Sequence, residues 1–367
     1  MNTPAKFVGP DQRAHAFPVS ARHSHLSRCA RLLLGLWLFA TSASFAAAER
    51  QPRGFVANER VILGGVAQSI VIRGRDRTLP VLLFVHGGPG FSQRPFAHAN
   101  AELERDFVVV HWDQRGTGRS FSPDIPRESM RIQRFVSDVE ELSRYLSRKF
   151  GQEKIYLLGH SWGSMIGLLA AARSPEFYHA YIGVAQVIDI PESERVLHVA
   201  ALRAAREKGD AKALGELQRI GPPPYKTLKG ERRINAISKM LSPQTPNGMS
   251  SARWIGLALS SPDFSVFETP RLMRGIRFTG FAMRDEIYAT DLAERVRTIR
   301  VPAYFLIGRF DTVISPAPTV RFFQKLRAPA GRRLIWFERS DHWPHLEERE
   351  RYAQVLREIK AASERPR

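Results

Sequence analysis

Apolar and polar positions follow two different patterns along the chain. Residues 55–63 and 66–72 alternate apolar with polar side chains around a Gly-Gly pair, which predicts a β-hairpin. Residues 79–85 and 108–112 are continuous apolar runs, the pattern of strands that are buried on both faces of a mostly parallel sheet. Residues 130–150 carry apolar side chains at spacings of three and four, which predicts an amphipathic helix.

The same alternation of strands and helices continues in both halves of the chain. The further elements predicted in this way are strands at 155–158, 178–187, 303–307 and 333–337 and helices at 316–326 and 348–362. Strands that alternate with helices predict an α/β fold, with a mostly parallel sheet and helices on both faces. The loops that follow the strands then meet at one edge of the sheet, where α/β proteins bind their ligands.

The strand pattern stops in the middle of the chain. Residues 188–297 are helical in composition, and Gly-Pro and Ser-Pro sequences break them into separate helices. The predicted helices lie at 196–207, 211–219, 232–241 and 252–259. We interpret residues 188–297 as a helical cap inserted into an α/β core, whose two parts are residues 49–187 and 298–367.

The N-terminal residues 1–48 differ from the rest of the chain. Basic residues precede the apolar run 32–40, and Ala46 and Ala48 then give the small-x-small pattern of a signal-peptidase site. This segment resembles a secretory signal peptide and predicts a periplasmic or secreted protein, without stable membrane insertion after cleavage. The alternatives are a membrane anchor through residues 32–48, which are fewer than the roughly 20 that a spanning helix needs, and a start codon further downstream.

Composition limits the class of protein. The 367 residues are 43% hydrophobic, which is typical of a globular protein with a sizeable core. Cys29 is the only cysteine and precedes the apolar run, so a chain cleaved after residue 48 has no disulfide and no cysteine nucleophile. The formal charge is +19, but the basic residues are scattered among acids and form no stripe with aromatic residues. We therefore expect no nucleic-acid partner.

A serine lies at the centre of a sharp strand-to-helix turn. Ser161 stands in a Gly-x-Ser-x-Gly pattern at 159–163, after an apolar run and before a stretch of helical composition. In a nucleophile elbow the glycines allow close backbone approach, and the helix N-terminus directs N–H groups at the serine. The alternative is a chance match in a Gly-rich loop, so the hypothesis requires partners elsewhere in the chain.

A serine nucleophile needs a base, and the base needs an acid that orients it. On a sheet of this kind the acid and then the base follow the serine along the chain. We favour His342 over His345 as the base, because His342 lies on the loop directly after the strand 333–337. We favour Asp311 as the acid, because it directly follows a strand, whereas Asp341 adjoins His342 and would direct its carboxylate away from the ring.

A tetrahedral intermediate also needs two backbone donors for its oxyanion. Trp162, which follows the serine, supplies one N–H group in this interpretation. Gly88 supplies the other, from the sequence HGGPG at 86–90, where small residues let the backbone approach the substrate carbonyl. The alternative for this sequence is an ordinary tight turn.

Three motifs in this order resemble the proline iminopeptidase branch of the α/β-hydrolase superfamily. They are HGGPG at 86–90, DQRGTGRS at 113–120 and GHSWGS at 159–164. The likeness covers residues 55–187 and 298–363. It implies hydrolysis of a small-molecule or short-peptide substrate through a Ser-Asp-His triad, without a metal or an organic cofactor, and in that family the release of an N-terminal proline.

Two features depart from that family's pattern. His160 precedes the serine where the family usually has glycine, and the cap lacks the Glu-Asn-His-Tyr-Phe segment whose glutamate holds the substrate amine in the family. Glu231, Glu268 and Glu286 lie in the cap, but no spacing distinguishes one of them.

Four classes of function are therefore compared. The leading hypothesis is a serine hydrolase that cleaves a small amide or ester in the manner of an aminopeptidase, and the rival is an esterase or lactonase. A dehalogenase or epoxide hydrolase is disfavoured because those relatives carry an aspartate at the elbow. A non-catalytic binding protein on the same scaffold is disfavoured because Ser161, Asp311 and His342 are all present.

Overall fold

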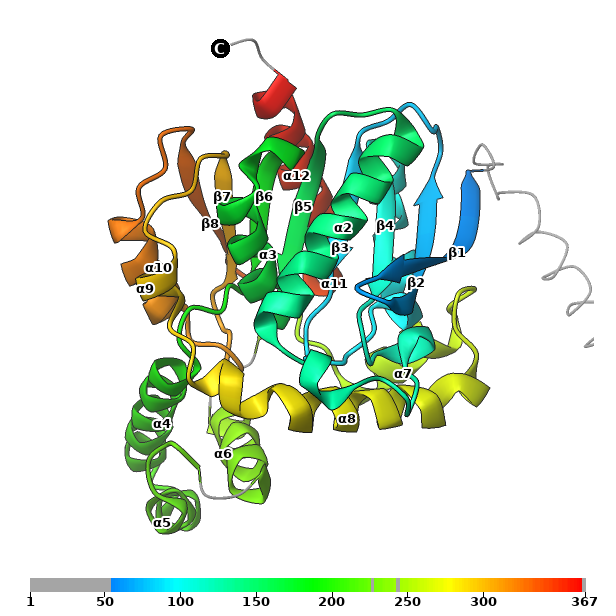
Figure 1. Ribbon diagram of the computed structural model, residues 1–367. Coiled ribbons are helices and arrows are strands. Elements are labelled where there is room, and N and C mark those ends of the chain that lie inside the picture. The colour runs from blue at the N-terminus through cyan, green and yellow to red at the C-terminus, as the bar shows by residue number, and fades with distance from the viewer. Residues whose placement is uncertain (1–53, 226–227, 242–244, 365–367) are drawn as a thin grey trace, which may run out of the picture. The chain divides into compact units, whose positions relative to one another are not determined.

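An eight-stranded sheet lies at the centre of the computed structural model (Figure 1), which describes residues 54–225, 228–241 and 245–364. The strands are β1 (Phe55–Leu63), β2 (Val66–Gly74), β3 (Val81–Val85), β4 (Val108–Asp113), β5 (Ile155–His160), β6 (Tyr178–Val184), β7 (Ala303–Gly308) and β8 (Arg332–Phe337). The predicted signal peptide and Cys29 lie outside the described residues.

The strand order is β1-β2-β4-β3-β5-β6-β7-β8. The hairpin of β1 and β2 pairs antiparallel and β2 is antiparallel to β4, whereas β3 to β8 are all parallel to their neighbours. The predicted mostly parallel α/β sheet is therefore confirmed. Val85 at the end of β3 lies opposite Trp112 of β4 and Gly159 of β5, so these three strands end at the same edge.

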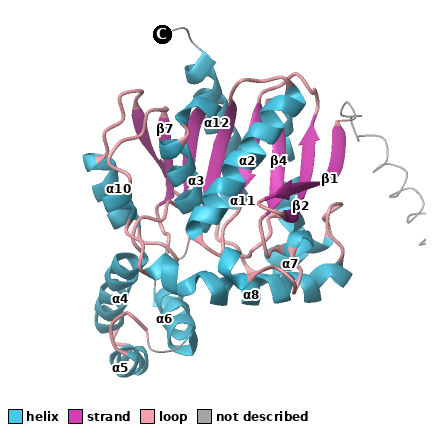
Figure 2. Cartoon of the chain, viewed as in Figure 1, coloured by secondary structure: helices cyan, strands magenta, loops and turns pink. Residues whose placement is uncertain are grey.

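Helices cover both faces of this sheet (Figure 2). The helices of the core are α2 (Ile132–Phe150), α3 (Trp162–Arg173), α10 (Pro316–Lys325), α11 (Pro344–Glu347) and α12 (Arg349–Glu364). Successive residues of a strand point to opposite faces: Leu83 packs in the core under α2 and α3, whereas Leu82 and Phe84 pack in the core under α12. Because β3 is covered on both sides, its sequence is continuously apolar.

The segment between β6 and β7 is helical, as the sequence predicts. Its helices are α4 (Ile190–Glu207), α5 (Ala211–Ile220), α6 (Leu228–Leu241), α7 (Ser251–Leu259), α8 (Thr269–Tyr288) and α9 (Leu292–Arg295), with the short helix η5 (Val266–Glu268) before α8. The helices α4 to α6 share a small apolar core of their own. We call α4 to α9 the cap, and α8 crosses below the carboxyl ends of the strands in Figure 1.

The 20-residue helix α8 is absent from our sequence prediction, as is the helix η1 (Arg94–Arg105). The first part of the face that α8 buries carries the small residues Gly275 and Thr279, since it packs closely against two Gly-rich turns, and Met283 and Ile287 continue this face. A Cβ atom on Gly275 would lie 2.7 Å from the carbonyl oxygen of Gly116, and the Thr279 hydroxyl donates to that same oxygen at 3.1 Å. Gly275 and Thr279 supply no apolar side chain, so the apolar periodicity of this face is weak in the sequence.

Candidate active site

Ser161 occupies a strained turn between β5 and α3. Its backbone has φ +53° and ψ −123°, a conformation that residues with a side chain adopt rarely. The Ser161 N–H group donates to Val184 of β6 at 2.9 Å, and the Ser161 carbonyl accepts the Ser164 hydroxyl at 2.6 Å. Contacts on both sides therefore hold the serine in the conformation of a nucleophile elbow.

The two glycines of the turn lie where no side chain fits. A Cβ atom on Gly159 would overlap the carbonyl oxygen of Gly163, and one on Gly163 would overlap the carbonyl oxygen of Val85. The start of α3 consequently packs directly against the end of β3. The turn follows from backbone approach rather than from a chance Gly-rich loop.

Asp311 and His342 meet at the same edge of the sheet. Oδ1 of Asp311 accepts the backbone N–H groups of Val313 and Ile314, and Oδ2 accepts Nδ1–H of His342 at 2.8 Å. The side chains of His342 and Asp311 are 3% and 1% exposed. Burial acts to lower the pKa of His342, but the facing Asp311 carboxylate, together with Asp341 and Glu347, outweighs burial and holds that pKa above its ordinary value. The arrangement leaves Nε2 of His342 as the proton acceptor.

The rival candidates of the sequence have other contacts. His345 lies in α11, is fully buried, and neither of its ring nitrogens has a hydrogen-bond partner. Burial, together with the nearby charge of His342, lowers the pKa of His345 to about 3. The Asp341 carboxylate accepts the backbone N–H of Thr312 at 3.2 Å instead of facing the His342 ring. The structure thus pairs Asp311 with His342, while the catalytic roles of both stay a prediction.

A third carboxylate beside this loop was not foreseen from the sequence. Glu347 of α11 accepts the backbone N–H of Asp341 through Oε2 at 2.8 Å. Burial and the neighbouring Asp341 carboxylate raise the pKa of Glu347 to about 7. Through this hydrogen bond Glu347 stabilises the loop that carries His342. Its only sequence signal is an acidic residue five positions after a candidate base.

His160, the departure from the family's elbow, also supports the loop of the base. Its Nε2–H donates to the backbone carbonyl of His342 at 2.9 Å. The His160 ring is fully buried, and its burial and the charges of His345 and His342 hold its pKa well below the ordinary value. His160 is consequently neutral. Because it directly precedes Ser161, it links the elbow to the main chain of the predicted base.

Gln114 joins the three motifs that the sequence analysis singled out. Its side-chain N–H group donates to the His86 carbonyl at 2.8 Å, and its side-chain oxygen accepts the indole N–H of Trp162 at 2.9 Å. The backbone N–H of Gln114 also donates to Nε2 of His86 at 3.3 Å. One buried amide thus holds the turns after β3, β4 and β5 together.

The predicted oxyanion donors flank Ser161. Trp162 is the first residue of α3, where backbone N–H groups have no partner within the helix. Gly88 has φ +122°, and the adjacent Gly87 is so close that its Cβ atom would lie 3.0 Å from Cβ of Ser161. Within the described part of the chain, neither the Gly88 nor the Trp162 N–H group has a hydrogen-bond acceptor. Both donors remain available to a ligand.

An aromatic wall borders the site on the side of the cap. Trp343, next to His342, lies with its ring centroid 4.8 Å from that of Trp254 on α7 and 5.6 Å from that of Phe91. The ring of Phe96 packs against Trp254 with centroids 4.7 Å apart. The sequence predicted the helix that carries Trp254 but not this contact, because the partners come from three separate segments.

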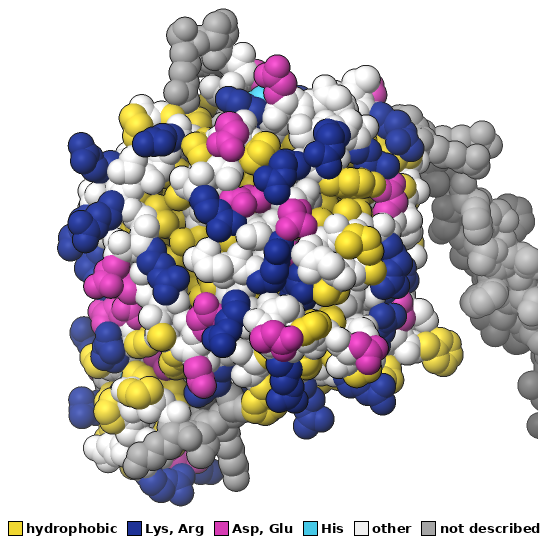
Figure 3. Space-filling model, viewed as in Figure 1, with side chains coloured by type: hydrophobic (Ala, Val, Ile, Leu, Met, Phe, Trp, Pro, Cys, Tyr) yellow, Lys and Arg dark blue, Asp and Glu magenta, His cyan; other side chains and the backbone are white. Residues whose placement is uncertain are grey.

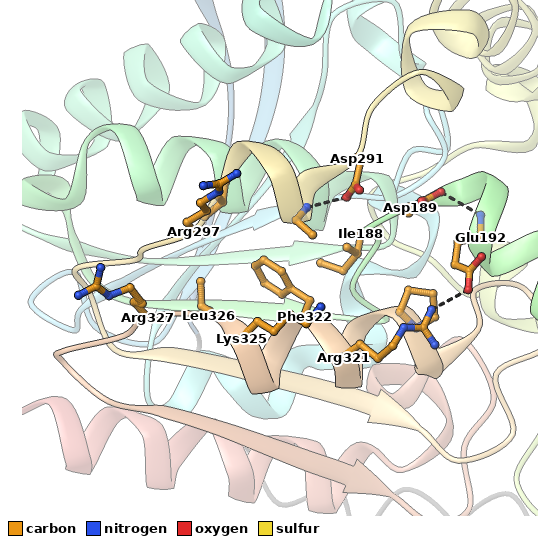
Figure 4. A pocket seen from close by; sticks show the side chains of 13 residues that line it. Ile188, Asp189, Glu192, Asp291, Arg297, Arg321, Phe322, Lys325, Leu326 and Arg327 are labelled. Atoms are coloured by element: carbon orange, nitrogen blue, oxygen red, sulfur yellow. Dashed lines mark hydrogen bonds and ion pairs between the residues drawn. The ribbon is translucent and has the colours of Figure 1, made fainter.

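A separate cavity of about 410 Å³ lies between α4, α9 and α10 (Figure 4). Ile188, Phe322 and Leu326 form its apolar floor. Its carboxylates are engaged locally: Glu192 pairs with Arg321 at 2.8 Å, and the aspartates there cap helices. Ser161, Asp311 and His342 do not line this cavity, so it is distinct from the candidate active site.

Two further observations concern the described residues as a whole. They contain no group of three or more His, Cys, Asp or Glu side chains placed to hold a metal ion. No helix that the structure describes is both long and apolar enough to cross a bilayer.

Comparison with known proteins agrees with this geometry. The sequence matches the alpha/beta hydrolase family over residues 82–355. The chain belongs to this family and is a hydrolase. It is 34% identical over 301 residues to a probable aminopeptidase, YbaC, of Bacillus subtilis, and this match covers 80% of the chain and 93% of the relative. A proline iminopeptidase of Saccharolobus solfataricus is 27% identical over 300 residues, which are 78% of the chain and 86% of the relative.

A solved structure shows the same fold. A proline iminopeptidase-related protein of Thermus thermophilus superimposes with a TM-score of 0.57 at 20% identity, and the match covers 84% of this chain and 98% of that one. Together these similarities place the protein in the proline iminopeptidase branch of the alpha/beta hydrolases.

Proposed function

We propose that the protein is a serine hydrolase that cleaves a small amide or ester, with Ser161 as nucleophile and His342 as its base. The observation that carries this proposal is the 2.8 Å contact of His342 Nδ1 with Asp311, at the sheet edge where Ser161 forms a strained turn. Asp311 fixes the tautomer that leaves Nε2 able to accept the serine proton. The serine oxygen then attacks the substrate carbonyl, and His342 returns the proton to the leaving group.

The oxyanion of the tetrahedral intermediate is stabilised in this proposal by Gly88 and Trp162. Both N–H groups are fixed by the turns that carry them, so they need no reorganisation when charge develops on the substrate oxygen. One such donor is typically worth about 10²- to 10³-fold in kcat. The hydrolysis is tested with aminoacyl and ester chromogens: wild type should turn over at least one class, and Ser161→Ala should lose at least about 10³-fold in kcat. A Ser161→Ala variant within tenfold of wild type would contradict the assignment.

The relatives' names make the release of an N-terminal residue from a short peptide the first candidate reaction. An aminopeptidase has to supply a carboxylate for the substrate amine, because a buried cation without a partner is costly. Glu268 instead forms an ion pair with Arg119 at 2.6 Å, and Glu286 accepts the backbone N–H of Ile132 at 3.0 Å. The side chain of Glu231 lies outside the described residues. Hydrolysis of uncharged esters is thus the second candidate.

Glu194 is a further cap carboxylate to test as an amine site, because it lies near the loop of the predicted acid. It lies half-buried on α4 and accepts the hydroxyl of Tyr288 from α8. The neighbouring Ser193 accepts the backbone N–H of Ser315 at 2.7 Å, four residues after Asp311. Glu194 therefore lies beside the contact between the cap and the loop that carries Asp311.

The substrate class is tested by comparing prolyl-p-nitroanilide with p-nitrophenyl butyrate. We expect the ester to be turned over at least as well, once each specificity constant is normalised to the uncatalysed rate, because Glu268 and Glu286 are engaged elsewhere. A clear preference for the prolyl substrate that Glu194→Gln abolishes would overturn this expectation and establish an amine site. Glu192→Gln is the matched control, since Glu192 lies two residues away and pairs with Arg321 on the surface.

A further inference from the structure

The exposed apolar side chains are concentrated on the cap. Eleven large hydrophobic side chains of the described residues are exposed, and eight of them belong to residues 188–297, about a third of the described chain. These eight are Val199, Met240, Ile255, Leu259, Val266, Phe267, Met273 and Phe281. Single exposed hydrophobic residues are normal, but their concentration on neighbouring elements indicates an interaction surface. Phe267 is the extreme case, with 90% of its side chain exposed.

The helix α8 presents two of these side chains, Met273 and Phe281, on one face, and Val266 and Phe267 lie in η5 just before it. At about 100° per residue, Met273, Arg274, Arg277 and Phe281 fall within roughly a third of the helix circumference. All four are exposed, whereas Gly275, Thr279, Met283 and Ile287 on the opposite face are buried. We define the cap surface as Val266, Phe267, Met273, Arg274, Arg277 and Phe281. It combines four large apolar side chains with two guanidinium groups.

The charge around the cap surface is predominantly positive. Residues 250–286 contain five arginines and four carboxylates. Glu286 accepts the backbone N–H of Ile132 at 3.0 Å, and Asp285 is exposed one turn beyond Phe281. Asp263 pairs with Arg73 at 2.6 Å, and Glu268 pairs with Arg119. Among the residues that the structure describes, Arg274 and Arg277 have no ion-pair partner. Figure 3 shows dark-blue basic side chains, with some magenta acidic ones, interspersed with yellow hydrophobic ones in the lower part of the molecule, where α8 lies.

We propose that the cap surface docks on an anionic lipid bilayer. Aromatic and aliphatic side chains that project from a helix face with arginines between them are the pattern of proteins that lie on a membrane interface. The apolar side chains enter the boundary of headgroups and acyl chains, while Arg274 and Arg277 bind lipid phosphates. The chain stays on the surface and does not span the bilayer.

Charge distinguishes a bilayer from a second copy of the chain as the occupant. A symmetric dimer through this surface would place Arg274 and Arg277 of one copy beside those of the other, because both partners use the same patch. The exposed carboxylate of Asp285 beside the cap surface is a single negative charge against two arginines in each copy, so it offsets that repulsion only in part. An anionic lipid surface neutralises these arginines and also covers the apolar side chains.

Docking in this way would bring the catalytic edge of the sheet close to the membrane. The opposite face of α8 packs on the turn after β4 and on the HGGPG turn, where a Cβ atom on Gly90 would lie 3.0 Å from the Gly275 carbonyl oxygen.

The inference does not depend on which residue is the nucleophile. Binding is measured without any substrate, so its failure and the failure of the proposed function are separate results.

The test is co-sedimentation with vesicles. Because the described residues from Gly54 onward form one compact unit with its own core, the chain from residue 49 onward is used, which removes the apolar run 32–40. Vesicles of phosphatidylcholine with 30% phosphatidylglycerol, on the order of an anionic natural membrane, are compared with pure phosphatidylcholine at low salt and in 0.5 M NaCl, where charge is screened. We expect binding to the anionic vesicles that salt reverses, and weak binding to the neutral ones.

Matched variants locate the binding surface. Phe267→Ser with Phe281→Ser, and separately Arg274→Gln with Arg277→Gln, should each weaken binding at least about fivefold, as expected when apolar burial and phosphate attraction both contribute. The control is Ile62→Ser with Arg148→Gln on the hairpin and α2, where Ile62 is 66% exposed.

Three results would overturn the proposal. The first is absence of binding to anionic vesicles, and the second is an equal loss in the control variant, which would indicate unspecific attraction by net charge. The third is a concentration-dependent dimer in sedimentation velocity that dissociates when Phe267→Ser and Phe281→Ser are introduced. The cap surface would then bind a second copy of the chain instead of a bilayer.

Discussion

The imidazole of His160 and the main chain of His342 are joined by a hydrogen bond of 2.9 Å across 182 residues of sequence. Because His160 directly precedes Ser161, this bond connects the predicted nucleophile and the predicted base through their neighbouring backbone. The histidine that departs from the family's usual elbow therefore positions the loop on which the base lies.

Replacing His160 should slow catalysis without abolishing it. His160→Gly removes the bond to the His342 carbonyl, and we expect kcat to fall about ten- to a hundredfold, since a displaced catalytic group loses reactivity steeply. His160→Gln should restore part of the loss, because its amide N–H can reach the same carbonyl. KM should change little in both variants. Steady-state kinetics with one chromogenic substrate measure kcat and KM of each variant. An unchanged kcat in His160→Gly would refute the positioning role.

The strained backbone at Ser161 predicts a difference between two inactive variants. Glycine adopts positive φ without cost, whereas alanine keeps the strain of a side chain at φ +53°. Ser161→Gly should therefore have a larger free energy of unfolding than Ser161→Ala, by about 1 kcal/mol. Urea denaturation of both proteins measures this difference. Equal or reversed stabilities would mean that the turn is not strained.

Asp311→Asn should change both the rate and its pH dependence. The base has to be neutral, so kcat/KM falls as pH drops through the pKa of His342. The Asp311 carboxylate holds this pKa above the ordinary value of about 6.5 against the effect of burial. Removing the negative charge should move the acid limb of the profile to lower pH, and kcat should fall by roughly 10³- to 10⁴-fold. An acid limb that stays in place would argue against Asp311 as the partner.

Buried neutral histidines should make the fold sensitive to acid. Burial, together with nearby positive groups, lowers the pKa of His345 and of His111 to about 3. The unfolded chain titrates these groups near pH 6.5, so between pH 6.5 and pH 3 it binds protons that the folded chain does not, and stability falls as pH drops. His342 acts in the opposite sense, because its raised pKa favours the folded state below pH 6.5.

The acid sensitivity can be assigned with one substitution. His345→Leu removes a buried ring whose two nitrogens have no hydrogen-bond partner. The loss of unfolding free energy between pH 7 and pH 5 should become smaller by about 2 kcal/mol. Urea titrations of wild type and variant at both pH values give this number. If the pH dependence is identical in the two proteins, His345 is not the origin of the effect.

The sheet and the pairing of Asp311 with His342 could be predicted because buried parallel strands have a plain signature. Continuous apolar runs mark the strands, and the residue after each run lies at the carboxyl edge. The position directly after a strand was therefore enough to select Asp311 over Asp341. The structure brings it within hydrogen-bond distance of His342.

Other parts of the site could not be read from the sequence. The helix α8 buries Gly275 and Thr279 against a Gly-rich turn, so its packing there depends on close backbone approach and weakens the apolar period. The contacts of His160 and Glu347 are made with backbone groups of the His342 loop. Backbone partners carry no residue-specific signal, and such contacts appear only when the fold is known.

The most direct test of the central claim is labelling with a fluorophosphonate, which reacts with an activated serine. We expect one label per chain on the peptide that contains Ser161, no label in Ser161→Ala, strongly slowed labelling in His342→Ala and nearly normal labelling in His345→Leu. Mass spectrometry of the digested protein identifies the labelled residue. A label on another residue, or labelling that depends on His345 rather than His342, would contradict the assignment of Ser161 and His342.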